Sequence, residues 1–410
     1  MTVLRKLLPL LLLASATALS AHDVQARFTT NKASYGIGEP IIVTLVVSNS
    51  GSSPIWVDFK SPDFPLLCHD FAVEIPEATT AGLWACGIAG SCARGFREIP
   101  TGGNIARRQL LNAEFSFNKD GIYTLHARTA IGVHNQNLFS SSEIDRLEVS
   151  DTLKVNLHRS SKSQLKAAFQ PYVEELHSPE LEESSEAAGA ITALAPPFLE
   201  DVLIELTKTN YAYAAIEALR KANTLKTREA LAQIARNGSD SMLRIEAIRN
   251  LGRTNDVTYL PTLVQLMDSD SKEIQNAAAE AAGNLGGSSA VPRLASLISS
   301  SNVVTRLAGT NGLGNSHANE AVPLLIGMLV DSDPNIRQGA VSGLCTPFMN
   351  GRINSYARTP LSLGDISSSL CITSGGWGGL RTRTSSISFS GCRAYRNALL
   401  GSWLSTLTSI

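Results

Sequence analysis

The sequence has little charge, few aromatic residues, little cysteine and no excess of charge of one sign. Of its 410 residues, 17% are charged and 6% are aromatic, and 35 Lys and Arg stand against 36 Asp and Glu. Without clustered basic residues to contact phosphates, the chain is not a strongly basic nucleic-acid binder. The formal net charge of -1 and the 43% hydrophobic residues exclude a disordered chain and supply a sizeable core. Six cysteines are too few for a fold held by a disulfide framework.

Familiar catalytic and metal-binding motifs are also absent. The seven histidines include no pair at the i, i+4 spacing, and the sequence has no HExxH, nucleophile-elbow, Walker or dinucleotide-binding motif in the required setting. Cys68 and His69 are adjacent, and neighbours on a strand point to opposite faces, so they do not form a nucleophile–base pair. We therefore expect a non-enzymatic protein without a cofactor or a metal, and an enzyme with no recognisable motif is the alternative.

The first 26 residues have the features of a secretory signal peptide. Arg5 and Lys6 precede an apolar run from Leu7 to Leu13, and small residues suited to cleavage precede Ala21 and Arg27. The run is shorter than the roughly 20 residues of a membrane-spanning helix, which makes a membrane anchor the weaker alternative. We expect an exported protein, periplasmic or extracellular, with no stable membrane insertion after cleavage.

The last residues, 347–410, differ abruptly in composition from the rest. From Gly351 onwards there are six Arg, no Lys, no Glu and a single acidic residue, Asp365. No helical or strand period persists, so we predict an unstructured tail or translation in a shifted reading frame.

A repeat with a period near 31 residues occupies residues 197–346. Pro261, Pro292 and Pro323 are spaced by 31, and steps of 32 backwards reach Glu229 and Pro197. The positions two and five residues later are apolar in all five units, which predicts a first helix in each unit. These positions are Leu199 and Val202, Leu231 and Ile234, Leu263 and Leu266, Leu294 and Leu297, and Leu325 and Met328.

A second helix is predicted in each unit around a recurring alanine. In the last four units an apolar residue lies four positions before this alanine and a capping residue lies seven before it. Glycines near the expected helix ends suggest C-terminal caps. The alanines are Ala215, Ala247, Ala278, Ala308 and Ala340; the apolar residues are Leu243, Ile274, Val304 and Ile336; the caps are Asp240, Ser271, Ser301 and Asp333; the glycines are Gly252, Gly286 and Gly314.

Five such helix pairs predict a right-handed α-solenoid, because a lone pair cannot bury its apolar stripe. The segment from Asp331 to Leu344 resembles the short bacterial type of HEAT-like repeat, and Asp268 to Ala278 is a weaker copy. The resemblance implies a scaffold that binds a protein partner through the capped helices. The candidate binding residues on these helices are Arg244, Arg249, Arg253, Lys272, Gln275, Arg306 and Arg337.

Residues 27–157 predict an immunoglobulin-like antiparallel β-sandwich. Six strand-like runs, at 41–47, 55–59, 71–75, 109–117, 122–129 and 152–157, are separated by turn residues. The segment from Tyr35 to Pro40 resembles the opening of bacterial extracellular sandwiches, and Tyr123 after Asp120-Gly121 resembles a tyrosine corner. The following residues, 158–196, predict a solvated helical and acidic connector, which has no calcium-loop spacing.

A Gly-rich loop within the predicted sandwich carries two cysteines. Cys86 and Cys92 are separated by five residues and can close a disulfide in an exported protein; pairing of Cys68 with either one is the alternative. A zinc site formed by these cysteines and His69 would match no known finger spacing. With Trp84 at its centre, the loop from residue 75 to 97 suggests a second function, the inhibition or regulation of an extracytoplasmic protease.

Overall fold

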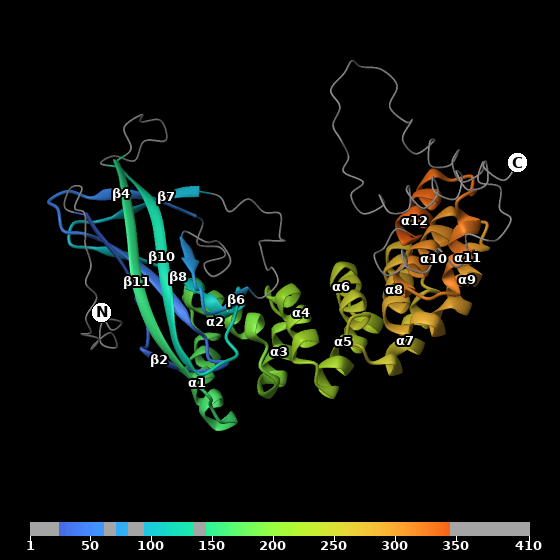
Figure 1. The fold of residues 1–410 in the computed structure, drawn as a ribbon, viewed down its shortest axis with the longest axis horizontal. Coiled ribbons are helices and arrows are strands. Elements are labelled where there is room, and N and C mark those ends of the chain that lie inside the picture. The colour runs from blue at the N-terminus through green and yellow to red at the C-terminus, as the bar shows by residue number, and fades with distance from the viewer. Residues whose placement is uncertain (1–23, 61–70, 81–93, 135–144, 345–410) are drawn as a thin grey trace, which may run out of the picture. The chain divides into compact units, whose positions relative to one another are not determined.

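The computed structural model describes residues 24–60, 71–80, 94–134 and 145–344 (Figure 1). The chain forms two compact units that divide between Val202 and Leu203. The first unit contains β-sheets and two helices, and the second contains helical repeats. The predicted tail at 347–410 lies outside the described residues.

The strands of the first unit form three sheets. One sheet has the order β1-β3-β8, a second has the order β2-β11-β10-β4-β7 with β5 also paired to β10, and β6 pairs with β9. The strands are β1 (Val24–Thr30), β2 (Ser34–Gly36), β3 (Ile42–Asn49), β4 (Ile55–Lys60), β5 (Ala72–Glu74), β6 (Thr79–Thr80), β7 (Arg94–Ile99), β8 (Asn104–Leu110), β9 (Phe115–Ser116), β10 (Gly121–His134) and β11 (Asp145–His158).

The predicted β-rich region is present, but its sheets differ in detail from a purely antiparallel sandwich. Strands β10 and β11 form a long antiparallel hairpin, and β2 adds to β11 in parallel, so the larger sheet is mixed. Among the described strands neither sheet closes on itself. The strand predicted at 109–117 is wrongly placed, because the strand there, β8, begins at Asn104 and ends at Leu110. Its two arginines hide the apolar alternation that would have predicted it. The immunoglobulin-like type stays a prediction.

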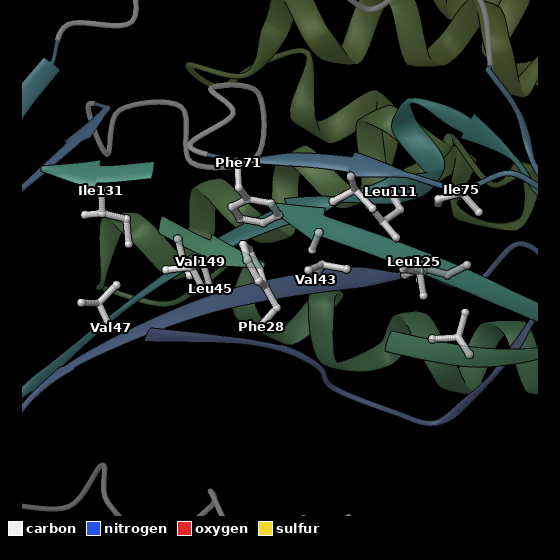
Figure 2. Close-up of a cluster of buried hydrophobic side chains, with 14 of the residues drawn as sticks. Phe28, Val43, Leu45, Val47, Phe71, Ile75, Leu111, Leu125, Ile131 and Val149 are labelled. Atoms are coloured by element: carbon white, nitrogen blue, oxygen red, sulfur yellow. The ribbon is translucent and has the colours of Figure 1, made fainter. Parts of the chain in front are cut away.

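The core of the first unit lies between the two larger sheets. Alternate residues of β3 are buried, which is the pattern of a strand with one face against a core. Figure 2 shows side chains from β1, β3, β10 and β11 meeting in this core, with Phe28 against Phe71 at 5.0 Å between ring centroids. The predicted tyrosine corner has its expected hydrogen bond, since Tyr123 Oη donates to the carbonyl of Lys119 at 3.0 Å.

The first strand overlaps the predicted signal peptide. Val24 lies within β1, is 1% exposed and pairs with Asn49 of β3. Cleavage before Arg27 would remove the first three residues of this strand. Of the two predicted cleavage sites, the one before Ala21 leaves β1 complete.

The predicted connector is helical, as expected, but its solvated character is wrong, because it packs on the sheets as two helices, α1 (Lys162–Glu175) and α2 (Leu181–Leu194). Phe169 of α1 is 1% exposed, and Ala190 of α2 packs against Leu110 of β8. Glu186, in the acidic run, is buried and forms an ion pair with Arg108 of β8. The alanine-rich second half of the segment forms the buried face of α2. The acidic residues of the segment led to the prediction that it is solvated.

Residues 200–344 form ten α-helices that alternate between a first and a second helix in five units, and the two helices of each of the last four units pack together (Figure 1). The first helices are α3 (Glu200–Leu206), α5 (Leu225–Asn237), α7 (Leu260–Leu266), α9 (Val291–Ile298) and α11 (Ala321–Met328). The second helices are α4 (Ala212–Ala222), α6 (Ser241–Leu251), α8 (Lys272–Gly286), α10 (Val303–Ser316) and α12 (Pro334–Leu344). All five recurring alanines have no exposed surface, as do Leu231, Leu263, Leu294 and Leu325 of the first helices.

The predicted register of the fourth unit is wrong by one residue. The cap of α10 is Asn302, whose Oδ1 accepts from the amides of Val304 and Thr305, whereas the prediction was Ser301. Val304 is 42% exposed, and Thr305 occupies the buried position. With Asn302 the four caps are spaced by 31, 31 and 31 residues. The prediction aligned Val304 and Ala308 with the core positions of the other units. The true equivalents are Thr305 and Gly309, which are less typical of a helix core. The other caps, Asp240, Ser271 and Asp333, are confirmed.

Candidate functional site: the second-helix layer

The second helices, α4, α6, α8, α10 and α12, pack side by side and approach one another more closely than the first helices do. Small residues permit this approach. A Cβ added to Gly283 of α8 would lie 2.1 Å from the carbonyl oxygen of Gly312 of α10, and one added to Gly314 of α10 would lie 2.9 Å from the Cα of Gly343. Of the three predicted glycine caps, Gly252 is confirmed as the C-cap of α6. Gly286 is instead the last residue of α8 and Gly314 lies within α10; the C-caps of these helices are Gly287 and His317, both with positive φ.

Four of the predicted binding residues occupy one repeat position and bond to their own repeat. Arg244, Gln275, Arg306 and Arg337 are spaced by 31 residues. Each donates to backbone carbonyls at the end of the preceding first helix or in the turn after it: to Ala235, to Met267, to Ser300 and Ser301, and to Asp331 and Ser332, respectively. These carbonyls lack helical partners, so the four side chains fix the turns.

Gln275 is not a surface residue as predicted. It is 7% exposed, and its Nε2 donates to the carbonyl of Met267 at 2.7 Å. Its Oε1 accepts from the Thr305 hydroxyl of the next repeat at 2.8 Å. Because a buried amide requires partners on both its nitrogen and its oxygen, this pair links the third and fourth repeats.

Arg306 also pairs with Asp331 of the following repeat. Its Nε and a terminal nitrogen lie 2.9 and 3.1 Å from the two carboxylate oxygens, which is a bidentate arrangement. The hydrogen bonds from Arg306 hold the pKa of Asp331 below its ordinary value. The folded state therefore favours the ionised form of this carboxylate.

The remaining predicted binding residues fall into two groups. Arg249 and Arg253 are exposed on or just after α6, and Lys272 is half-buried at the start of α8. Arg249 lies 3.9 Å from Glu246, a weak ion pair. The remaining binding candidate, Trp84, lies outside the described residues, as does most of the loop from residue 75 to 97. The predicted disulfide between Cys86 and Cys92 also falls there.

A row of polar side chains that the prediction missed crosses the second-helix layer. In its first part Arg220 of α4 bonds to Glu217 and reaches Asn250 of α6, at 3.1 Å from Nε to Oδ1. Asn250 in turn donates to Glu246 at 2.8 Å. In its second part the amides of Asn276 and Asn311 both donate to Glu280, as described below. The 31-residue spacing of Arg249, Glu280 and Asn311 is the signal that could have revealed the row.

Exposed apolar residues lie at the starts of several second helices. Tyr213, Met242 and Val304 are each the second residue of their helix, and they are 51%, 56% and 42% exposed. Tyr213 and Met242 lie four residues before Glu217 and Glu246 of the polar row, and therefore on the same face of their helices. Exposed apolar side chains near polar ones are typical of a surface that contacts another protein.

In the ranges that the structure describes, no group of three or more His, Cys, Asp or Glu is placed to hold a metal ion. None of the described helices is both long and apolar enough to cross a bilayer.

Comparison with known proteins identifies the repeats. Residues 228–308 match the family model of HEAT repeats. No curated protein matches the sequence.

The solved structures that are similar to this chain have low scores. Human deoxyhypusine hydroxylase in complex with glycerol is 15% identical over 51% of this chain and 96% of its own, with a TM-score of 0.25. The complex of CpcE and CpcF of phycocyanin lyase from Nostoc is 14% identical over 51% and 82%, with a TM-score of 0.26. Computationally designed armadillo repeat proteins for modular peptide recognition are 16% identical over 45% and 93%, with a TM-score of 0.27. The family match and the chain's own helix pairs thus establish a protein with a HEAT-like repeat region.

Proposed function

We propose that this protein is an exported, non-enzymatic scaffold that binds a protein partner on the second-helix layer of its HEAT-like repeats. The observation that supports this most is the polar row that joins neighbouring second helices, with exposed Tyr213, Met242 and Val304 beside it. HEAT repeats commonly mediate protein binding, which agrees with this surface. The signal-peptide features of the first residues support export.

The hydrogen bonds of the predicted binding residues reduce the number of side chains that a partner can contact. Arg244, Arg306 and Arg337 are engaged by the turns of their own repeats, so they are not available as a basic patch. Exposed positions on the second helices include Asn284 of α8 and Gln338 of α12. Exposed positions on the first helices include Gln265 of α7 and Ser296 of α9, and these provide matched controls.

The test compares two double variants of the full-length mature chain in affinity capture from its own envelope or medium fraction. We expect Asn284→Arg with Gln338→Arg to lose a protein that the unchanged chain retains, because bulky charges then obstruct the second-helix layer. Gln265→Arg with Ser296→Arg should retain it. Retention by the first pair and loss by the second would overturn the proposal, and so would capture of nothing by the unchanged chain. The N-terminal mass of the chain recovered outside the cytoplasm tests export separately.

A further inference from the structure

Glu280 of α8 is held by amide groups from two successive second helices. Its Oε1 accepts from Asn276 Nδ2 of the same helix at 3.0 Å and from Asn311 Nδ2 of α10 at 3.3 Å. Asn311 also donates to Asn276 Oδ1 at 3.4 Å. All three side chains are half-buried, so the carboxylate has a fixed position on the layer rather than a freely rotating one.

In the part of the chain that the structure describes, the charge of Glu280 is not paired with a basic side chain. On α4 Glu217 pairs with Arg220, and on α6 Glu246 pairs with Arg249, in each case three residues further along the helix. The corresponding residue for Glu280 is Gly283, where the backbone of α10 leaves no room for a side chain. Among the described residues no Lys or Arg forms an ion pair with Glu280. The close packing of α8 and α10 therefore leaves no room for a basic partner three residues further along α8.

Neutral amides fix the direction of a carboxylate but do not compensate its charge. A half-buried ionised group is stabilised most by an opposite charge that also donates hydrogen bonds. Among the described side chains both donors to Glu280 bond to Oε1, so its second oxygen can receive such a donor.

We propose that Glu280 binds a lysine or arginine side chain of the partner protein, while Asn276 and Asn311 hold its carboxylate in place. The inference rests on the proposed function and assigns the chemistry of the partner's contacting residue. A partner segment that lies across α8 and α10 places its basic side chain at Glu280 and its apolar side chains near Val304.

The test uses the full-length chain and an array of unrelated 12-residue peptides, each made with arginine and with its uncharged analogue citrulline at the same position. We expect the unchanged chain to bind a subset of arginine peptides about tenfold or more tightly than their citrulline forms, as for a charge-assisted hydrogen bond. Glu280→Gln should abolish this preference and its dependence on salt. Glu273→Gln, which changes an exposed carboxylate at the start of the same helix, should leave both unchanged.

The inference is overturned if the unchanged chain shows no preference for arginine over citrulline, or if Glu280→Gln keeps it. A melting temperature of Glu280→Gln close to that of the unchanged chain separates loss of binding from loss of structure. If the second-helix double variant still loses its captured protein while Glu280→Gln retains it, the proposed function stands and the inference about Glu280 fails.

Discussion

At the scale of single residues, the distance between second helices depends on glycines that have no space for a side chain. The atoms nearest to an added Cβ at Gly283 all belong to backbone, namely Gly312 and Ser316 of α10. Backbone cannot rotate away as the end of a side chain can, so α8 and α10 would have to separate. Gly327 of α11 is the opposite case, because nothing lies within 4 Å of its added Cβ.

Gly283→Ala is expected to lower the free energy of unfolding by about 1–3 kcal/mol, as overpacking does in other cores. The matched change Gly327→Ala should be neutral or raise it by up to about 1 kcal/mol, because alanine favours the helix. Urea denaturation of both variants measures the difference. Equal effects of the two changes would contradict the close approach of α8 and α10.

The pair of Arg306 and Asp331 should make stability depend on pH. The pKa of Asp331 is lowered in the folded state, so its contribution is present above the ordinary value of 3.8 and is lost as pH falls through the folded pKa. Asp331→Asn is therefore expected to be less stable than the unchanged chain at neutral pH, with the difference shrinking below about pH 4. Denaturation across this pH range measures it. Asp268→Asn, which removes an exposed pair with Arg293, should show little difference at any pH.

At the scale of elements, the second helices α6, α8, α10 and α12 each begin at a polar cap, and these caps are spaced by 31 residues. Asn302 accepts from two amides at the start of α10, while the neighbouring Ser301 is not the cap. Asn302→Ala should lower the free energy of unfolding by about 1 kcal/mol. Ser301→Ala should change it by a few tenths at most, within the spread of ordinary surface changes. Thermal denaturation of the two variants compares them, and the reverse order would restore the register predicted from the sequence.

The helical elements were predictable because their signals are local. Buried alanines, leucines and caps recur at fixed spacing, and three of the four predicted caps are confirmed. The prediction of the fourth cap failed because Thr305 and Gly309 occupy core positions at which apolar residues are expected. The packed helices α1 and α2 failed because Glu186 looks solvated until Arg108, 78 residues earlier, is brought beside it. The contact of Asn311 with Glu280 forms only when neighbouring repeats stack, so the 31-residue spacing was its one signal in the sequence.

At the scale of the whole molecule, the two units have separate cores. Leu263 is fully buried among the helices of the second unit, and Val43 is fully buried between the sheets of the first. Leu263→Ala is expected to cost about 2–5 kcal/mol and to increase amide hydrogen exchange in helices after Leu203. Strands β3 and β10 should keep their protection. Val43→Ala should increase amide hydrogen exchange in the strands of the first unit and leave the helices after Leu203 protected. A uniform increase across both units would show that they unfold together.

The repeat region can change in length by whole repeats because the turns are held from within each repeat. The side chains that hold them are those of Arg244, Gln275, Arg306 and Arg337. Each of these four repeats carries the donor that completes its own turn, and their caps recur after 31 residues. Removing residues 272–302 would therefore join the cap of one second helix to the body of the next in the same register. Gene duplication and deletion can thus add or remove whole repeats as cassettes, whereas a single inserted residue within a second helix displaces the glycines that face its neighbours.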